Sequence, residues 1–218
     1  MGGALSHQRA PEAWDSGRLA EETVPVTISQ HKGGAVTTSR DEGVRPETTP
    51  EGLARLPAAF SPNGTITAGN ASQVSDGAAA VVVMSAEWAR SLSVQPLAEI
   101  VAHGMSEERY AWLHTVPALA LARGLEKAGL RTDDLDLVEV NEAFAPVALN
   151  VTRMLALDEE LVNVNGGAVA LGHPIGASGA RPVLTLAHEL RRRGARLGAA
   201  TLCGGGGQGA ALIIKKMD

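Results

Sequence analysis

The sequence is poor in cysteine, in aromatic residues and in long apolar runs, and each shortage excludes a class of protein. One cysteine in 218 residues cannot build a disulfide framework within the chain and favours a reducing compartment, so we expect a cytoplasmic protein. Aromatic residues make up 3% of the chain, too few to stack the bases of single-stranded nucleic acid. A net charge of −5 gives no attraction toward nucleic acid or an anionic membrane surface.

Signals for membrane insertion, secretion and metal binding are also missing. No apolar run reaches the roughly 20 residues that a membrane-spanning helix needs. Residues 1–20 lack the apolar core of a secretory signal peptide, so no leader is expected. The six histidines show no ligand spacing and no Cys-x-x-Cys pair occurs, so we expect no metal site. The 44% of apolar residues is nevertheless enough for a substantial core.

Segments typical of strands and of helices alternate along most of the chain. Residues 1–64 are rich in loops, with one short helix expected from Pro50 behind the cap Thr49. Strands are expected at residues 65–67, 78–84, 97–102, 135–140, 195–202 and 210–216. Helices are expected at residues 85–91, 116–128, 142–155 and 175–193, the second ended by Gly129 and the last by Gly194. This alternation predicts an α/β layered fold.

A histidine lies in a glycine-rich stretch that runs from Asn165 to Gly179. Small residues on both sides of His173 would let a substrate approach the backbone closely. The helix expected from residue 175 would add unpaired N–H groups and positive potential beside the imidazole. The alternative is an incidental histidine in the loop before a helix. Ser178 does not complete the Gly-x-Ser-x-Gly of a nucleophile elbow, so we interpret it as helix surface or packing.

The single cysteine is followed by five glycines within six residues, between two expected strands. These glycines, in residues 204–209, would open space around the sulfur of Cys203 and expose backbone N–H groups that could bind an oxyanion. A dinucleotide-binding loop is excluded because a strand, and not a helix, follows the glycines. A buried structural cysteine is the alternative.

A polar motif directly follows the strand expected at residues 135–140. It reads Asn141-Glu142-Ala143-Phe144-Ala145 and lies where the site residues of α/β folds gather. Taken alone, Asn141 is equally well explained as a helix N-cap, and Glu142 as an acidic residue of the first helical turn. A second polar segment, residues 67–78, by itself indicates a turn.

Three motifs, taken together and in their order along the chain, resemble the thiolase family, the acetyl-CoA acyltransferases and acetyltransferases. They are Asn-Glu-Ala-Phe-Ala at 141–145, Gly-His-Pro-Ile-Gly-Ala-Ser-Gly-Ala-Arg at 172–181 and Cys-Gly-Gly-Gly-Gly-Gln-Gly at 203–209. The likeness runs through essentially the whole chain. It implies a Claisen condensation of acyl-CoA or its reverse, the thiolysis of a 3-oxoacyl-CoA. It also implies coenzyme A as a substrate, no separate cofactor, and a place in fatty acid metabolism such as β-oxidation.

The resemblance implies roles for four catalytic residues. Cys203 would be the acid–base thiol that moves the proton at the carbon next to the thioester, with its pKa lowered by its neighbours from about 8.5 toward neutrality. His173 would activate the nucleophilic cysteine and help to bind the thioester oxygen. Asn141 would hold a water that completes this oxyanion site. The backbone N–H of Gly205 would serve the second oxyanion hole.

Three further residues would contact the substrate by the same resemblance. Ser72 and Arg45 would contact coenzyme A, and Phe144 would line the acyl pocket. Gln73-Val74-Ser75 departs from the family's usual Gly-x-Asn, and residues 112–117 depart from its Gly-x-Gly-Pro-x-Pro. Both departures lie near the expected acyl or CoA pocket, so the preferred acyl chain length stays open.

The family fold is a five-layered αβαβα sandwich of two similar halves, with a loop domain inserted in the first half. The resemblance therefore implies a loop-domain remnant at residues 1–74, the last strand and helix of the N-terminal half at 75–95, and the C-terminal thiolase half at 96–218. The family's nucleophilic cysteine lies in the N-terminal half. Cys203 alone cannot hold the acyl group and also act as the base.

We therefore expect this chain to complete an active site together with a separately encoded N-terminal half that carries the nucleophile. The family also implies acyl-CoA substrates and a homo-oligomer, with no nucleic acid or membrane as partner. Two alternatives stay open, an inactive thiolase fragment with an exposed apolar face and a non-catalytic module that binds acyl-CoA.

Overall fold

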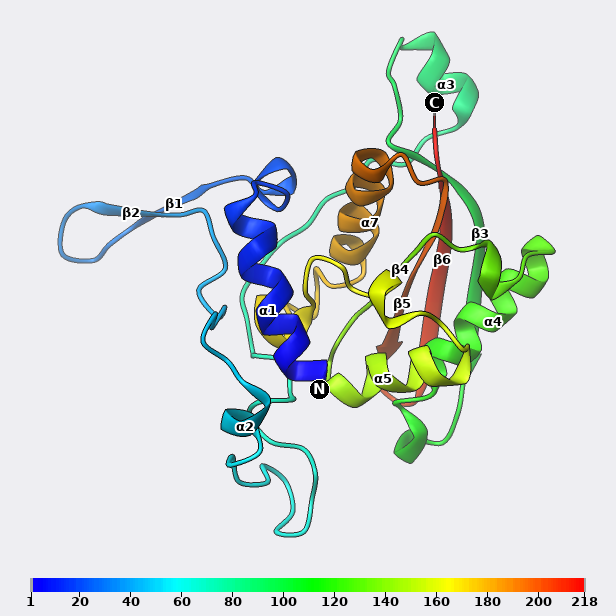
Figure 1. Ribbon diagram of the computed structural model, residues 1–218. Coiled ribbons are helices and arrows are strands. Elements are labelled where there is room, and N and C mark those ends of the chain that lie inside the picture. The colour runs from blue at the N-terminus through cyan, green and yellow to red at the C-terminus, as the bar shows by residue number, and fades with distance from the viewer. Residues whose placement is uncertain (1, 218) are drawn as a thin grey trace.

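A four-stranded mixed sheet with helices on both faces forms the centre of the fold (Figure 1). The computed structural model describes residues 2–217. The strands lie in the order β3 (Ala98–Glu107), β6 (Gln208–Lys216), β5 (Leu197–Gly204) and β4 (Leu137–Val140). β4 and β5 run parallel, and the other neighbouring strands are antiparallel. The arrangement confirms the predicted α/β layered fold.

Alternate residues of the strands point to opposite faces of the sheet and build two separate cores. Val138 of β4 packs in a cluster with α4 (Val116–Ala128) and α5 (Ala145–Met154). Leu137 of the same strand packs with α7 (Ala180–Arg193) on the other face. The carboxyl end of β4 is therefore fixed between two helical layers.

Helix α4 has the predicted bounds, and the signals that set them are local. Pro117 lies in the first turn, where a missing N–H breaks no helical hydrogen bond. Gly129 adopts a φ of 65° and ends the helix, as predicted. The helix lies so close to β3 that a Cβ at Gly104 would collide with the carbonyl of Ala120.

The N-terminal segment lies across this body and continues into a hairpin that projects away from it (Figure 1). Helix α1 (Gly2–Asp15) contacts α5 and α6 (Ala168–Leu171). The hairpin of β1 (Val26–Ser29) and β2 (Ala35–Thr38) is exposed along nearly its whole length. The remaining short elements are the helices α2 (Pro50–Leu53) and α3 (Ala86–Ser91) and the 3-10 turns Ala20–Glu22, Tyr110–Trp112, Thr132–Asp134 and Glu159–Leu161.

Each of the two short helices begins behind a hydroxyl side chain that caps it. The side chain of Thr49 accepts from the N–H of Gly52 at the start of α2, which confirms the helix predicted behind Thr49. Ser85 caps α3 in the same way. Within residues 2–217, no helix is both long and apolar enough to cross a membrane. The division of the chain at residues 74 and 95 stays a prediction.

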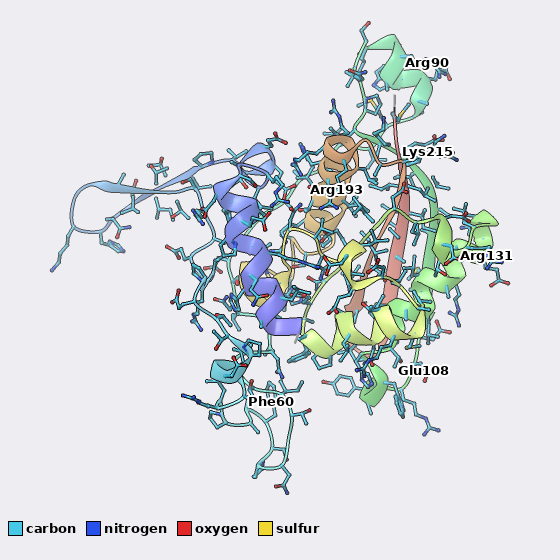
Figure 2. All side chains as sticks on the ribbon, in the orientation of Figure 1. Phe60, Arg90, Glu108, Arg131, Arg193 and Lys215 are labelled. Atoms are coloured by element: carbon cyan, nitrogen blue, oxygen red, sulfur yellow. The ribbon has the colours of Figure 1, made fainter. Side chains whose placement is uncertain are left out.

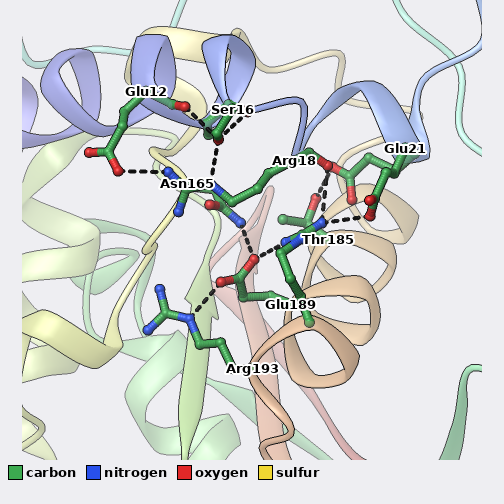
Figure 3. A network of polar contacts seen from close by, with 11 residues as sticks. Glu12, Ser16, Arg18, Glu21, Asn165, Thr185, Glu189 and Arg193 are labelled. Atoms are coloured by element: carbon green, nitrogen blue, oxygen red, sulfur yellow. Dashed lines mark hydrogen bonds and ion pairs between the residues drawn. The ribbon is translucent and has the colours of Figure 1, made fainter.

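Polar contacts fasten the N-terminal segment and the loop before α6 to helix α7 (Figure 3). Thr185 donates to Oε1 of Glu22 at 2.6 Å. Glu189 is 1% exposed and accepts from Nδ2 of Asn165 at 2.9 Å and from Nε of Arg193 at 2.5 Å. These contacts tie helix α7 to the N-terminal segment and to the loop before α6.

The apolar run at residues 78–84 is not a strand, so that prediction was wrong. No strand lies next to it among the described residues, and Val82 and Val83 are 84% and 69% exposed. A strand needs a neighbour for its backbone N–H and C=O groups, and an apolar sequence alone does not supply one. Residues 65–67 likewise form no strand but only an isolated bridge between Ala58 and Thr67.

The other predicted elements are present with shifted ends. The strands predicted at residues 97–102, 135–140, 195–202 and 210–216 correspond to β3, β4, β5 and β6. Helix α5 begins at Ala145 and not at Glu142, because the chain up to Phe144 stays extended after β4. Helix α7 begins at Ala180 and not at residue 175, because glycine-containing turns occupy residues 174–179. Gly194, with a φ of 63°, ends α7 as predicted.

Candidate active site

The carboxyl end of β4 lies beside that of β5 and brings two predicted site residues to one edge of the sheet. Val140 pairs with Thr201 in the parallel ladder, and the N–H of Asn141 donates to the carbonyl of Thr201 at 2.9 Å. Cys203 follows Thr201 by two residues on β5, so it lies at the same edge as Asn141. Phe144 holds the N-cap position of α5, so the explanation of Asn141 as a helix cap was wrong.

The loop after α6 brings His173 against Asn141. Nδ2 of Asn141 lies 3.4 Å from Nε2 of His173. On the other side of the ring, Nδ1 lies 2.6 Å from Oγ of the fully buried Ser178. The Ser178 hydroxyl donates its one hydrogen to the carbonyl of Pro174 at 3.0 Å, so it accepts from Nδ1. The neutral imidazole therefore carries its hydrogen on Nδ1 and has a lone pair at Nε2.

Asn141 offers a second feature at this edge, an unused hydrogen-bond acceptor. Its side chain is 2% exposed, and its Oδ1 has no hydrogen-bond partner among the described residues. An unpaired buried acceptor costs about 1–3 kcal/mol, so a water or ligand donor beside it would be stabilised. Such a donor would lie next to the imidazole of His173, where a water is predicted.

Cys203 lies near the end of β5 and is 8% exposed. Burial raises the pKa of the Cys203 thiol, so the expectation of a pKa lowered toward neutrality was wrong. The pKa of His173 is lowered, first because partial burial disfavours the charged imidazolium and second because the positive charge of Arg181 lies nearby. Near neutral pH the site therefore holds a protonated thiol and a neutral imidazole, an acid and a base.

The turn between β5 and β6 leaves open space at Gly205. A Cβ at this exposed residue would meet no atom within 4 Å. Gly206 and Gly207 both have a φ of 83°, a left-handed conformation that glycine adopts at low cost. The latter two glycines shape the turn, while the surroundings of Gly205 leave room for a ligand.

The buried side chains of Asn163 and Glu142 hold the end of β4 in place through hydrogen bonds. Oδ1 of Asn163 accepts from the N–H of Val140 at 2.7 Å, and its Nδ2 donates to the Val140 carbonyl at 2.9 Å and to Glu142 at 3.1 Å. Glu142 also accepts from the N–H of Val169 at 3.2 Å. Burial raises the pKa of Glu142, and its hydrogen bonds oppose that rise. Glu142 therefore joins β4 to α6, and its placement in a first helical turn was wrong.

Residues 70–74 connect the loops that carry Asn141 and His173. The N–H of Ser72 donates to the carbonyl of the residue before Phe144 at 3.1 Å, and isolated bridges pair this segment with both loops. The half-buried Phe144 packs edge-to-face on Phe60, with ring centroids 6.2 Å apart; Figure 2 labels Phe60 near α2. Ser72 and Phe144 therefore lie beside the pair of Asn141 and His173.

Arg45 lies apart from these residues. Its backbone N–H donates to Nδ1 of His7 at 3.3 Å, and its exposed guanidinium makes no hydrogen bond or ion pair within residues 2–217. The structure thus brings Arg45 into no contact with the other predicted site residues, but leaves its charge free for an anion.

Within residues 2–217, no three His, Cys, Asp or Glu side chains are placed to hold a metal ion.

Gln73, a departure from the family pattern, cross-links three segments around the site. Its Nε2 lies 3.1 Å from the carbonyl of Gly43, 3.3 Å from that of Val169 and 3.2 Å from that of Ala170. These contacts are structural, and they hold the backbone of Gln73 beside the histidine loop.

Comparison with known families agrees with this geometry. The description "Thiolase, C-terminal domain" matches residues 94–216, and "Thiolase, N-terminal domain" matches residues 3–87. The chain belongs to the thiolase family. The predicted family and fold are therefore confirmed.

Individual thiolase relatives are similar over almost the whole chain. The probable acetyl-CoA acetyltransferase of Mycolicibacterium smegmatis is 52% identical over 213 residues, which cover 98% of this chain and 55% of the relative. The crystal structure of the Bacillus anthracis acetyl-CoA acetyltransferase has a TM-score of 0.96 and 45% identity, covering 99% of this chain and 55% of that one. For human mitochondrial 3-ketoacyl-CoA thiolase the TM-score is 0.94 at 46% identity, with 99% and 54% covered. The chain thus spans about half the length of these relatives.

Two residues that support the candidate site were not predicted from the sequence. The interpretation of Ser178 as helix surface or packing was wrong in its first part, because Ser178 is buried and bonds to His173. The signal available was its position five residues after the histidine in one loop. Asn163 gave no such signal, because 23 residues separate it from its partner Val140.

Proposed function

We propose that this chain supplies the acid–base part of a thiolase active site that transfers acyl groups between thiols of coenzyme A and the enzyme. The reaction would be thiolysis of a 3-oxoacyl-CoA or, in reverse, Claisen condensation of acyl-CoA. The observation that carries the proposal is the pair of Asn141 and His173, in which the lone pair at Nε2 of the imidazole faces Nδ2 of the amide at 3.4 Å and the buried Oδ1 of the amide is unpaired among the described residues. The edge of the sheet that carries this pair also carries Cys203.

In the proposed thiolysis, Nε2 of His173 accepts the proton of a nucleophilic thiol. The resulting thiolate attacks the C3 carbonyl of the 3-oxoacyl-CoA, and the bond between C2 and C3 breaks with its electron pair moving to C2. Cys203 donates its proton to C2, which releases acetyl-CoA. The raised pKa of the buried Cys203 thiol supports this role as a proton donor. A CoA thiol then gives its proton to the Cys203 thiolate and displaces the acyl group from the nucleophile, whose thiolate takes its proton back from His173.

Two groups would stabilise the oxygens that become negative during these steps. A water held by Oδ1 of Asn141, together with the protonated Nε2 of His173, would bind the thioester oxygen. The N–H of Gly205 would bind the oxygen of the group attached to the nucleophile, and the open space around this glycine supports the role. Removing one such donor from an enzyme of this kind lowers kcat about 10²–10³-fold.

We also propose substrate contacts for three residues. Ser72 would contact coenzyme A and Phe144 would line the acyl pocket, and both lie beside the Asn141 and His173 loops. Arg45 would bind an anionic part of coenzyme A, a role supported by its exposed and unpaired guanidinium.

The nucleophilic thiol must come from outside these 218 residues, because they contain one cysteine. We propose an N-terminal thiolase half as its source, separately encoded, and a homo-oligomer of the completed enzyme. Fatty acid breakdown by β-oxidation in the cytoplasm is the proposed setting.

The test is thiolysis of acetoacetyl-CoA and of a longer 3-oxoacyl-CoA by the purified chain, with and without an N-terminal thiolase half from the Mycolicibacterium smegmatis relative. We expect no turnover by the chain alone and turnover in the mixture, lost about 10²–10⁴-fold when Cys203→Ala replaces the wild type. Turnover by the chain alone would contradict the need for two thiols. CoA binding without turnover in the mixture would favour the non-catalytic acyl-CoA-binding module.

A further inference from the structure

The peptide unit that leads into His173 is held at both ends. Its carbonyl, that of Gly172, accepts from Nη1 of Arg181 at 2.9 Å, and its N–H donates to the carbonyl of Gln73 at 3.1 Å. Gly172 has a φ of 89° where α6 ends, and a Cβ there would collide with the side chain of Ser75. The backbone next to the imidazole therefore has little freedom, and Arg181 is the side chain that limits it.

Arg181 lies in the first turn of α7, partly buried and without a direct ion pair among residues 2–217. Four acidic side chains face it at longer range, namely Asp41, Glu22, Glu139 and Glu142. Burial raises the pKa of all four carboxyl groups, that of Glu22 to about 7. Glu22 is therefore only partly ionised near neutral pH and no carboxylate contacts Arg181 directly among residues 2–217, so the positive charge of Arg181 acts on neighbouring groups.

We propose that Arg181 is a positioning residue for His173. It holds the Gly172 carbonyl so that Nε2 of the imidazole stays beside Asn141, and its positive charge favours the neutral imidazole that can accept a thiol proton. The inference rests on the proposed function, because it gives Arg181 a task in the proton transfer assigned to His173. The lowered pKa of His173 supports it, with partial burial as the larger cause and the charge of Arg181 as the second.

The hydrogen bond and the charge can be separated by substitution. Arg181→Gln keeps an N–H donor and removes the charge, whereas Arg181→Lys keeps the charge on a shorter donor. Arg191→Gln is the matched control, because Arg191 is exposed on the same helix and loses the same charge. We expect Arg181→Gln to raise the pKa of His173, Arg191→Gln to leave it unchanged, and Arg181→Lys to keep it below the ~6.5 of a free imidazole.

The measurement is a pH titration of the ¹⁵N-labelled 218-residue chain by NMR, following the ring nitrogens of His173. Amide spectra of each variant establish that it is folded. A higher pKa in Arg181→Gln alone supports the proposal. An unchanged pKa in folded Arg181→Gln, or an equal rise in Arg191→Gln, overturns it.

If Arg181→Gln does not fold, Arg181→Met, which also removes the charge, is titrated against Arg181→Lys, which keeps it. A His173 pKa higher in Arg181→Met than in Arg181→Lys supports the proposal, and equal values overturn it, because the burial of His173 is common to both variants. Because the titration needs no turnover, its outcome is independent of whether the chain completes a thiolase. If the mixture with an N-terminal half shows no thiolysis but Arg181→Gln still raises the pKa of His173, the proposed function is wrong and the effect of Arg181 on His173 stands.

Discussion

Replacing Asn163 by alanine should strongly destabilise the fold at the edge of the candidate active site. The side chain is 4% exposed and makes three hydrogen bonds, two to the backbone of Val140 and one to the carboxyl of Glu142. A typical net contribution is about 1 kcal/mol for each bond, and more where a buried group is left unpaired. Asn163 also has a φ of 49°, which asparagine tolerates better than alanine. We therefore expect a loss of about 3–5 kcal/mol in the free energy of unfolding.

The assay is urea unfolding at 25 °C followed by circular dichroism, for the wild type and for Asn163→Ala. Asn150→Ala is the matched control, because Asn150 is half-buried on α5 and makes no hydrogen bond through its side chain within the described residues. The control should stay within about 0.5 kcal/mol of the wild type. A loss of less than about 1 kcal/mol in the free energy of unfolding of Asn163→Ala would refute the claim that the hydrogen bonds of this side chain stabilise the end of β4.

Three further predictions concern titration and access at single residues. Burial raises the pKa of Glu22 to about 7 from 4.5, so folding favours its protonated form; this contribution is complete below pH 4.5 and is lost as the pH rises through 7. Glu22→Gln keeps an acceptor for Thr185, so its free energy of unfolding in urea should match that of the wild type at pH 4.5 and exceed it at pH 8 by up to about 3 kcal/mol. Equal free energies of unfolding at pH 8 would show that burial does not raise the pKa of Glu22. Cys203, buried and with a raised pKa, should react with iodoacetamide at pH 8 at least about tenfold more slowly in the folded chain than in urea, and equal rates would contradict its burial. Ser178→Ala should remove the acceptor for Nδ1 of His173 and mix the two imidazole tautomers, visible in the ¹⁵N shifts of the ring; an unchanged tautomer would mean that Ser178 does not select it.

Elements defined by local signals could be predicted from the sequence, and α4 is the clearest case. Pro117 lies in its first turn and Gly129 directly follows its last residue. Both act on the helix through the local backbone, so their effect does not depend on the rest of the fold. Residues 78–84 show the opposite case. Their apolar run indicated a strand, but strand formation requires a neighbouring strand, and residues 2–217 place none beside them.

For the candidate site too, local motifs could be predicted from the sequence, whereas properties that depend on packing could not. Asn141 and His173 lie in motifs whose residue types point to chemistry, and the structure brings them within 3.4 Å. The pKa of Cys203 could not be predicted, because the glycines after it suggested exposure and only the packed structure gives its burial. The contact of Arg181 with Gly172 depends on the turns at residues 174–179, of which residues 175–179 were predicted as helix.

If Cys203 moves the proton at C2 of the substrate, it should catalyse the exchange of the C2 protons of acetyl-CoA with deuterium oxide. The chain would be incubated with acetyl-CoA and the N-terminal half of the Mycolicibacterium smegmatis relative, and deuterium at C2 followed by NMR, with Cys203→Ala as the matched variant. We expect exchange in the wild-type mixture and a fall of about 10²-fold or more in Cys203→Ala, because no other residue is assigned this proton transfer. Equal exchange in both mixtures would show that a group other than Cys203 moves the proton.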